Sequence, residues 1–202
     1  MNSPIDFYFD FSSPYGYFAA EMIEEIGQRC GRGVNWHPIL LGVVFKTTGG
    51  QPLTMAPMKG PYSERDMLRS AAFYGLPFRM PTVFPIATQN PARAALWMQQ
   101  NHPAHAKKFI LELFRAFFRG DRDISKLDVI GDIATGLGYS ADEVLSATQS
   151  DAIKNLLKAN VEAAIAKGVF GAPFFIVDDE PFWGADRLPM LERWLTKGAW
   201  KY

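Results

Sequence analysis

Hydrophobic side chains alternate with polar ones near the start of the chain, and this alternation predicts a β-strand. From Ile5 to Phe11 every second residue is aliphatic or aromatic, which places these side chains on one face of an extended segment. Tyr8 makes the opposite face partly apolar as well, as expected for a strand that is covered on both sides. We therefore expect residues 5–11 to form a buried strand.

Two serines and a proline follow this strand and mark the beginning of a helix. Pro14 suits the first helical position, because the N–H that proline lacks would be unpaired there. Ser12 or Ser13 can accept hydrogen bonds from the first free amides of the helix. Apolar residues then recur with helical spacing and predict a helix over residues 15–29, which ends near the glycines at 31 and 33.

The next part of the chain predicts a second strand, a long loop and a block of helices. Residues 34–45 are expected to form the strand, and residues 46–61 are rich in turn-forming residues and long enough to make a functional loop. Asn90 and Ser140 are expected to cap two of the helices, the second one in a capping box with Glu143. The predicted helices cover residues 62–74, 91–101, 103–118, 127–137, 141–148 and 151–167.

The C-terminal part of the chain returns to strands. Residues 174–177 have the pattern of a strand, residues 178–181 that of a turn, and residues 181–184 that of a short return strand. A last helix is expected from Asp186 to Leu195. The chain would thus end in a strand, a hairpin turn, a strand and a helix.

The order of these elements predicts the fold class. A β-α-β unit, a helical block and a β-β-α unit are the arrangement of an α/β thioredoxin-like fold with a large all-helical insertion. Residues 1–45 and 168–202 would form the thioredoxin-like domain, and residues 46–167 the loop and the helical insertion domain.

Composition and charge narrow the classes of partner. The chain has 202 residues, 48% of them hydrophobic and 14% aromatic, which is typical of a single globular unit. Lysine and arginine number 21 and so do aspartate and glutamate, so no net field attracts nucleic acid or an anionic membrane. No apolar stretch reaches the ~20 residues of a membrane helix. We expect a small-molecule or protein partner, no nucleic acid and no membrane.

Cysteine and histidine are too few for several kinds of site. The single cysteine, Cys30, cannot form an intramolecular disulfide, and the first residues lack the features of a secretory signal, so we expect a cytoplasmic protein. Cys30 is expected to be an inert thiol, because no C-x-x-C partner lowers its pKa. The spacing of His37, His102 and His105 is not that of a metal site. Phosphate-binding glycine loops and the serine-hydrolase elbow are absent from the sequence as well.

Ser13 is the first candidate for chemistry. Its hydroxyl is expected at the end of a strand and the start of a helix, where unpaired amides and the positive end of the helix dipole stabilise an anion. A serine at such a position is only a helix cap in most proteins. Its position alone therefore leaves both interpretations open, a cap and a catalytic group.

Two further stretches are expected to lie near Ser13. Pro173 stands at the start of a strand, although proline is normally excluded from the interior of a sheet. In a thioredoxin-like sheet it would be a cis-proline that faces the first helix, and the backbone of Ala172 would be free to pair with an extended peptide-like ligand. The stretch from Phe182 to Leu188 joins the last strand to the last helix, and its amides together with Asp186 could bind the two charges of an amino-acid end.

Three strings, taken in order, make the chain resemble a known family. They are F-D-F-S-S-P-Y, G-V-F-G-A-P-F-F and F-W-G-A-D-R-L. Together they resemble the 2-hydroxychromene-2-carboxylate isomerases and their relatives, the kappa-class glutathione transferases, over nearly the whole chain. The resemblance implies a thioredoxin-like domain with a helical insertion, usually a homodimer, that binds glutathione between the serine-proline turn and the cis-proline loop.

The resemblance also implies a reaction, which belongs to aromatic compound catabolism. In the isomerase the glutathione sulfur adds to the unsaturated substrate, the ring opens, a bond rotates and the thiol is expelled. A 2-hydroxychromene-2-carboxylate and its trans ring-opened α-keto acid are interconverted without net oxidation. Glutathione is regenerated and acts as a cofactor.

Roles for particular residues follow from the same resemblance. Ser13, the serine immediately before the proline, would bind the glutathione thiolate and act as the catalytic residue. Lys46 would lie at the substrate pocket and hold a substrate carboxylate or an enolate-like intermediate, unless it is a solvated loop lysine. The other contacts to glutathione would come from Ala172, Pro173, Trp183, Gly184, Ala185 and Asp186.

The chain departs from the family pattern at three places. Ala185 stands where relatives often have serine or asparagine, so a side-chain donor is missing. Gly50 occupies a place where some relatives offer an asparagine to glutathione. The stretch from Phe84 to Asn90 lacks the asparagine that some members have two residues after its proline. These departures weaken the expectation of the chromene substrate in particular.

Three alternatives to the isomerase are compared with the sequence. A kappa-like transferase would use the same fold to conjugate glutathione to electrophiles. A disulfide oxidoreductase needs a C-x-x-C dithiol at the start of the helix, and residues 13–16 read Ser-Pro-Tyr-Gly, so this alternative is nearly excluded. A non-catalytic module that binds glutathione or a peptide would use Ser13 only as a cap.

Overall fold

A computed structural model describes residues 3–200 of the chain. Its strands are β1 (Ile5–Phe9), β2 (Val34–Pro38), β3 (Phe174–Val177) and β4 (Glu180–Trp183). Its α-helices are α1 (Pro14–Arg29), α2 (Leu41–Thr48), α3 (Lys59–Tyr74), α4 (Gln89–Asn101), α5 (Pro103–Phe118), α6 (Leu127–Gly136), α7 (Ala141–Gln149), α8 (Asp151–Ala166) and α9 (Leu188–Lys197). Two short 3-10 helices are η1 (Leu53–Met55) and η2 (Ala185–Arg187). This order confirms the predicted thioredoxin-like fold with a helical insertion.

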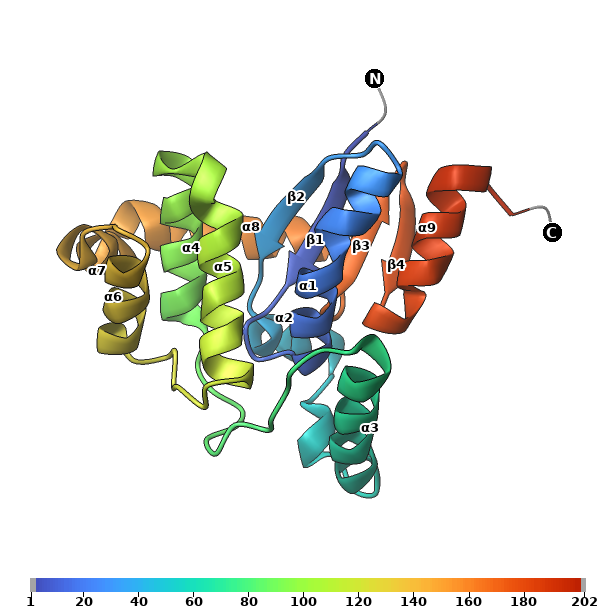
Figure 1. Cartoon of the computed structure of the whole chain (residues 1–202), viewed down its shortest axis with the longest axis horizontal. Coiled ribbons are helices and arrows are strands. Elements are labelled where there is room, and N and C mark those ends of the chain that lie inside the picture. Colours follow the sequence, from blue (N-terminus) through green and yellow to red (C-terminus); the bar gives the residue numbers. More distant parts are fainter. Residues whose placement is uncertain (1–2, 201–202) are drawn as a thin grey trace.

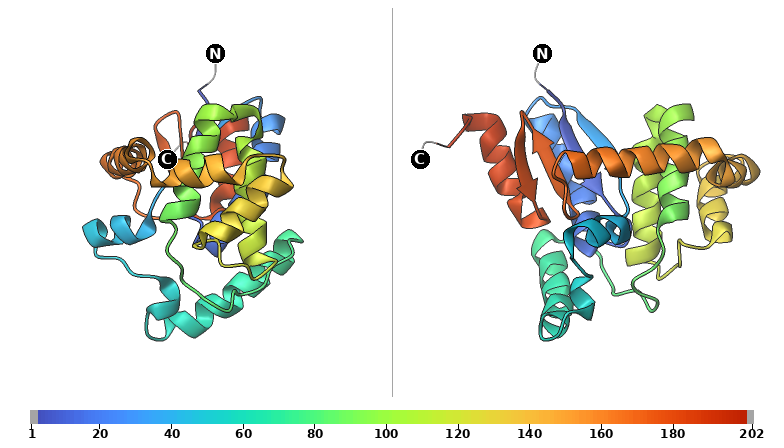
Figure 2. Two further views of the ribbon diagram at one scale, coloured as in Figure 1. Left: turned by 90° about the vertical axis from the view of Figure 1, so that its left-hand side faces the viewer. Right: turned by 180° about the vertical axis from the view of Figure 1, so that it is seen from behind.

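The strands form one mixed sheet in the order β2-β1-β3-β4. β1 runs parallel to β2 and antiparallel to β3, and β4 is the antiparallel edge strand next to β3. Helix α1 covers one face of the sheet (Figure 1), and α8 crosses the other face (Figure 2). The central strand β1 is therefore covered on both sides, as its apolar side chains predict, and Phe7 and Phe9 are fully buried.

The inserted helices lie beside the sheet and share its core. Helices α4 to α7 are grouped on the β2 side of the sheet (Figure 1), and α5 packs against α1. The ring of Phe114 in α5 lies 5.6 Å from that of Phe9 and 4.8 Å from that of Phe11. Because one aromatic cluster spans both parts, the insertion stabilises the segment that leads from β1 to α1. The division of the chain into two domains stays a prediction, and its proposed limit at residue 45 falls inside α2.

The strand predicted for residues 34–45 is wrong in its second half. β2 ends at Pro38, and residues from Leu41 onward form helix α2 instead. The buried carboxylate of Asp10 accepts a hydrogen bond from the backbone N–H of Leu41 at 2.6 Å, which supplies the helix with the cap that its own sequence lacks. The apolar, β-branched residues of this segment favour a strand locally, and a contact from far along the chain overrides them.

Smaller differences concern the ends of elements. β1 ends at Phe9 rather than at Phe11, the loop predicted for residues 46–61 contains the end of α2, η1 and the start of α3, and the last α-helix begins at Leu188 after η2. Asn90 is not the cap of α4, because the helix begins at Gln89 and its N-cap is Thr88. The amide of Asn90 donates to the carbonyl of Ser125 at 3.1 Å. Ser140 does cap α7, since its hydroxyl accepts from the backbone N–H of Glu143.

Helix α3 and η1 project from the end of the sheet at which β1 delivers the chain to α1 (Figures 1 and 2). Their contacts are mostly with each other and with the N-terminal part of α1. They form one wall of the cavity described below. Within residues 3–200, no helix combines the length and the apolar composition needed to cross a membrane.

Candidate active site

Ser13 is the N-cap of α1, and its hydroxyl lies between the helix and the cis-proline loop. Its Oγ accepts a hydrogen bond from the N–H of Gly16 at 3.0 Å and donates one to the carbonyl oxygen of Ala172 at 2.9 Å. A Cβ at Gly16 would lie 3.1 Å from the Cβ of Ser13, a tight contact that would press on the Ser13 side chain. Two hydrogen bonds thus hold the hydroxyl in one position. The bond to Ala172 joins residues that lie 159 positions apart in the sequence.

The electrostatic environment of Ser13 favours an anion. The first turn of α1 contains no acidic residue that would neutralise the positive end of the helix dipole. Pro14 occupies the first helical position and removes one N–H from the end of the helix. The amides of Gly16 and Tyr17 already donate to Ser13, so the N–H of Tyr15 and the Ser13 hydroxyl are the donors that a bound anion could use.

The cis-proline loop faces Ser13 as the sequence predicts. The Ala172–Pro173 peptide bond is cis, and the carbonyl of Pro173 accepts from the N–H of Gly184 at 3.0 Å. The indole of Trp183 packs over Gly171, where a Cβ would lie only 2.5 Å from Nε1 of the tryptophan. The loop and the end of β4 are therefore one packed unit.

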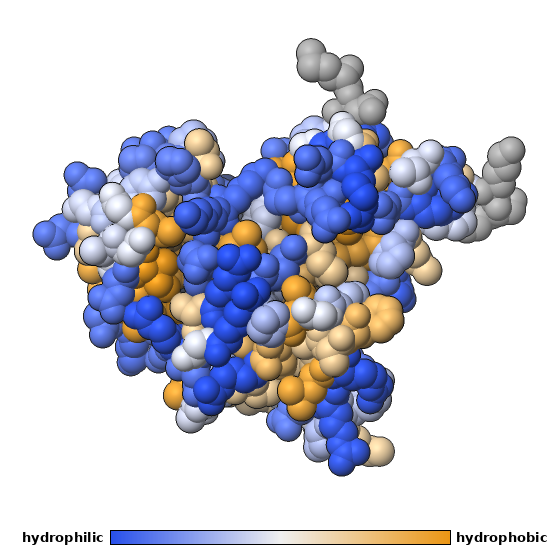
Figure 3. Space-filling view, in the orientation of Figure 1, coloured by the Kyte–Doolittle hydropathy of each residue, from blue (hydrophilic) through white to orange (hydrophobic). Residues whose placement is uncertain are grey.

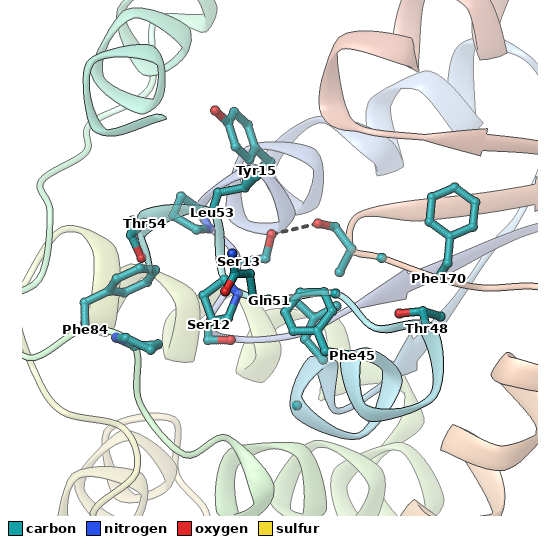
Figure 4. Close-up of a pocket in the computed structure, with 18 of the residues that line it drawn as sticks. Ser12, Ser13, Tyr15, Phe45, Thr48, Gln51, Leu53, Thr54, Phe84 and Phe170 are labelled. Carbon is teal, nitrogen blue, oxygen red and sulfur yellow. Dashed lines mark hydrogen bonds between the residues drawn. The ribbon is translucent and has the colours of Figure 1, made fainter. Parts of the chain in front are cut away.

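A cavity of about 840 Å³ opens beside Ser13. Its size is within the range of small-molecule sites, roughly 300–1,000 Å³. Figure 4 shows the aromatic and aliphatic side chains that surround the Ser13 hydroxyl, which come from α1, α2, η1 and the segments around Phe84 and Phe170. The lining residues are Ser12, Ser13, Pro14, Tyr15, Leu41, Gly42, Phe45, Lys46, Thr48, Gly50, Gln51, Pro52, Leu53, Thr54, Met67, Phe84, Pro85, Ile86, Phe170, Gly171, Ala172 and Trp183. Lys46 is the only charged residue among them.

Comparisons with known proteins agree with this geometry. The model of the DSBA-like thioredoxin domain family matches residues 4–196. The chain is 30% identical to a 2-hydroxychromene-2-carboxylate isomerase of Sphingobium xenophagum over 197 residues, which are 96% of this chain and 99% of the relative. The chain belongs to the DSBA-like thioredoxin family and, within it, to the 2-hydroxychromene-2-carboxylate isomerase family.

Two further matches support this assignment. A solved structure of a 2-hydroxychromene-2-carboxylate isomerase superposes with a TM-score of 0.85 at 27% identity and covers 93% of this chain and 92% of that one. Glutathione S-transferase kappa 2 of Caenorhabditis elegans is 28% identical over 96% of this chain and 92% of its own. The matched relatives therefore share the whole architecture, including the insertion.

The structure brings four of the predicted site residues to the cavity of this family member. Ser13, Ala172 and Trp183 lie at one end of it, and Lys46 reaches it from α2 rather than from the predicted loop. Pro173 is buried next to Ala172. Their roles toward a ligand stay predictions.

The remaining predicted residues do not line the cavity. Gly184, Ala185 and Asp186 follow Trp183 at the turn into η2, where Ala185 is buried and the Asp186 carboxylate pairs with Arg187 at 2.7 Å. The side chain of Asp186 is 69% exposed, so it is accessible to a ligand that extends past Trp183.

Several cavity residues were missed by the sequence analysis. Tyr15 lines the cavity and donates its hydroxyl to Oδ2 of Asp66 in α3 at 2.7 Å (Figure 4 shows the ring turned away from Ser13). Burial, and then the hydrogen bond to Asp66, raise the pKa of Tyr15, so its phenol stays neutral. Its position two residues after Ser13 was the only local signal.

Phe45 explains one departure from the family pattern. A Cβ at Gly50 would lie 2.7 Å from Cδ1 of Phe45, so the phenylalanine ring fills the place that a side chain at position 50 would need. Gln51, the next residue, lines the cavity and offers an amide near this point. The spacing of these residues gave no hint of the contact, because it depends on α2 being a helix.

Residues 3–200 contain no group of three or more histidine, cysteine, aspartate or glutamate side chains that could hold a metal ion. Cys30 is the C-cap of α1, and burial raises the pKa of its thiol. The donors at the cavity are instead hydroxyls, amides and one ammonium group.

Proposed function

We propose that the protein is a glutathione-dependent isomerase that interconverts a 2-hydroxychromene-2-carboxylate-like substrate and its trans ring-opened α-keto acid. The observation that carries this proposal is the Ser13 hydroxyl at the N-terminus of α1, held beside an apolar cavity in a chain of this isomerase family. The cofactor of the proposed reaction is glutathione, and the substrate is a small aromatic-derived acid.

The residues present fit a tripeptide thiol. The cis-proline loop lies beside the N-terminal end of α1, and the largely apolar cavity opens next to both. When bound, glutathione supplies a thiol that adds to the substrate and is later eliminated. Ala172 and Pro173 would hold its central part, and Trp183, Gly184, Ala185 and Asp186 would hold its γ-glutamyl end.

Ser13 would hold the proton that stabilises the thiolate. In the structure the Ser13 O–H donates to the carbonyl of Ala172, while the bond from the N–H of Gly16 fixes the oxygen. Rotation about the Cβ–Oγ bond would redirect the O–H without moving the oxygen. The hydroxyl can therefore exchange a carbonyl for a thiolate as its acceptor, and hydrogen bonds to a charged acceptor are about twice as strong as neutral ones.

Lys46 would hold the substrate carboxylate. Among residues 3–200 it is the only charged residue that lines the cavity, and the other side chains there are mostly apolar. Lys46 is exposed, and a substrate that covered its ammonium group would strengthen the attraction to the carboxylate by excluding water. It would also stabilise negative charge that develops on the conjugated acid during the reaction.

A direct assay tests the proposal. The protein is incubated with glutathione and a 2-hydroxychromene-2-carboxylate, and the trans product is followed by absorbance and chromatography. We expect product formation that requires glutathione and does not consume it. Turnover of 1-chloro-2,4-dinitrobenzene with none of the chromene carboxylate would refute the isomerase and leave a transferase.

The transferase is the second candidate, and the likeness to a kappa-class glutathione transferase of C. elegans favours it. Both reactions need a thiolate, and they differ in whether the thiol is expelled again. A module that binds glutathione or a peptide without catalysis is the third candidate. It would bind the tripeptide with Ser13 as a cap and turn over neither substrate.

We also propose that the protein is a cytoplasmic homodimer. Exposed apolar side chains gather on α3 and the segment before it, and Figure 3 shows hydrophobic surface where α3 meets the sheet. The most exposed are Met55, Met58, Tyr62, Leu68 and Phe73. Sedimentation equilibrium at micromolar concentration measures the mass, and a monomer would contradict this part of the proposal.

A further inference from the structure

Asp10 carries a buried carboxylate that the proposed reaction does not use. It follows β1 directly, and only 2% of its surface is exposed. No ion pair joins it to a cation within residues 3–200, which is unusual for a buried charge. Such a group needs a reason, because burying a carboxylate without compensation is costly.

The compensation comes from polar groups of three separate segments. Oδ1 accepts from the backbone N–H of Ser12 at 2.7 Å and from its hydroxyl at 2.8 Å. Oδ2 accepts from the backbone N–H of Leu41 at 2.6 Å, and the hydroxyl of Thr88 lowers the pKa of the carboxyl. Burial raises the pKa of Asp10, and these donors oppose that effect.

Each of the three segments forms part of the cavity. Ser12 precedes Ser13, whose N–H is in turn bound by the backbone carbonyl of Asp10 at 3.0 Å. Leu41 begins α2, the helix that brings Phe45 and Lys46 to the cavity. Thr88 begins α4 directly after the wall segment 84–86.

We propose that Asp10 is a positioning residue, whose carboxylate holds the Ser13 turn and helix α2 at a fixed distance across the cavity. One carboxylate oxygen accepts a hydrogen bond from the turn, and the other accepts one from the helix. The thiolate donor and the substrate cation would then keep their relative positions without touching each other. The kinetic part of this inference rests on the proposed function, whereas the structural part does not.

The substitution Asp10→Asn tests it with little change of shape. An amide has one acceptor oxygen and an NH₂ group, so either the N–H of Ser12 or that of Leu41 must face a donor. We expect amide hydrogen exchange to become at least about tenfold faster in residues 12–17 or 41–48, since bonds to charged groups are among the stronger ones. Exchange in α5 should not change, which separates local release from general destabilisation.

Kinetics of the same variant supply the second readout. We expect the KM for the acidic substrate to rise at least about tenfold and kcat to fall, while the affinity for glutathione in calorimetry changes by less than about threefold, because the two partners of Ser13 remain. A purely structural role would lower the melting temperature and the active fraction without moving KM. Unchanged exchange in both segments together with an unchanged KM would overturn the inference.

Thr88→Val keeps the test decisive if Asp10→Asn does not fold. It removes the hydroxyl that lowers the pKa of the Asp10 carboxyl, retains the shape of the side chain and lies outside the cavity, so a smaller effect in the same direction is expected. Thr148→Val is the matched control, because Thr148 is equally buried and donates to Leu145 within α7. Equal rates of amide hydrogen exchange in α2 of the two valine variants would contradict the proposal.

If the wild-type protein turns over no substrate, the proposed function fails, and the hydrogen-exchange experiment still decides the role of Asp10.

Discussion

At the scale of single residues, Ser13 shows how one side chain can have a structural and a chemical role together. It caps α1 through Gly16, as the local sequence predicts, and it also binds the carbonyl of Ala172. The first contact makes it a cap, and the second places its proton next to the candidate ligand site. A substitution has to separate these two roles.

Ser13→Ala should lower kcat by ~10²-fold, because it removes a positioned donor to the anion. The hydroxyl stabilises the charged thiolate, so its loss should raise the pKa of the bound thiol and shift the acid limb of the pH–rate profile to higher pH. The measurement is kcat against pH at saturating glutathione. Ser12→Ala is the control, since the Ser12 hydroxyl donates to Asp10 and not to the Ala172 carbonyl. The decrease in kcat for Ser12→Ala should be smaller. A decrease within about twofold for Ser13→Ala would favour the cap alone.

Lys46→Met should affect charged and uncharged substrates differently. Loss of a charge-assisted hydrogen bond is expected to raise the KM for the chromene carboxylate by about 10- to 100-fold. Turnover of 1-chloro-2,4-dinitrobenzene, which carries no carboxylate, should change little. Steady-state kinetics with both compounds on one preparation make the comparison, and an equal effect on both would show that Lys46 does not select an acid.

At the scale of elements, the site depends on contacts between segments that are distant in sequence. The cis-proline loop packs under the indole of Trp183 because residue 171 has no side chain. The carboxylate of Asp10, at the end of β1, accepts a hydrogen bond from the first N–H of helix α2. Both contacts fix where an element lies rather than what it is.

Gly171→Ala should displace Trp183 and weaken glutathione binding. The new Cβ would lie 2.5 Å from Nε1, and overpacking of this kind usually costs about 1–3 kcal/mol. Isothermal titration calorimetry should show an affinity lower by about tenfold. Gly136→Ala at the end of α6 is the control, because a Cβ there meets no atom within 4 Å. An unchanged affinity for Gly171→Ala would mean that the position of the indole does not matter for binding.

At the scale of the whole molecule, one acidic side chain joins the thioredoxin-like part to the helical insertion. Glu21 of α1 is 8% exposed in its side chain and binds Arg115 of α5 at 2.8 Å and Arg119, the C-cap of α5, at 2.6 Å. Arg119 also donates to the hydroxyl of Tyr17 at 2.6 Å. The insertion is therefore tied to the helix whose first turn carries Ser13.

Glu21→Gln should lower the free energy of unfolding by about 2 kcal/mol, because it removes the carboxylate that pairs with Arg119 and one of the two carboxylates that pair with Arg115. Glu25→Gln is the control, since the pair of Glu25 with Arg29 lies on the surface and contributes little. Urea unfolding followed by tryptophan fluorescence measures both. Equal losses for the two variants would show that the link between α1 and α5 adds nothing beyond a surface ion pair.

Much of the fold was predictable because its signals are local. The alternation of Phe7 and Phe9 marks a buried strand, and helix ends follow from Pro14, Ser140 and nearby residues. The segment after Pro38 was not predictable, since its valines and leucines fit a strand and a helix equally well. The predicted cap at Asn90 was wrong because α4 begins at Gln89, so Asn90 lies inside its first turn.

The amino-acid sequence by itself determined the order of the elements, the position of Ser13 at a helix end and the family to which its three strings point. These depend on neighbours within a few residues or on similarity along the chain. Only the tertiary structure decided that Ser13 meets Ala172, that α2 is a helix and that Lys46 and Tyr15 share one cavity with them. The physical reason is that each of these contacts joins residues far apart in sequence, and a buried hydrogen bond or a packed ring outweighs the local preference of either partner.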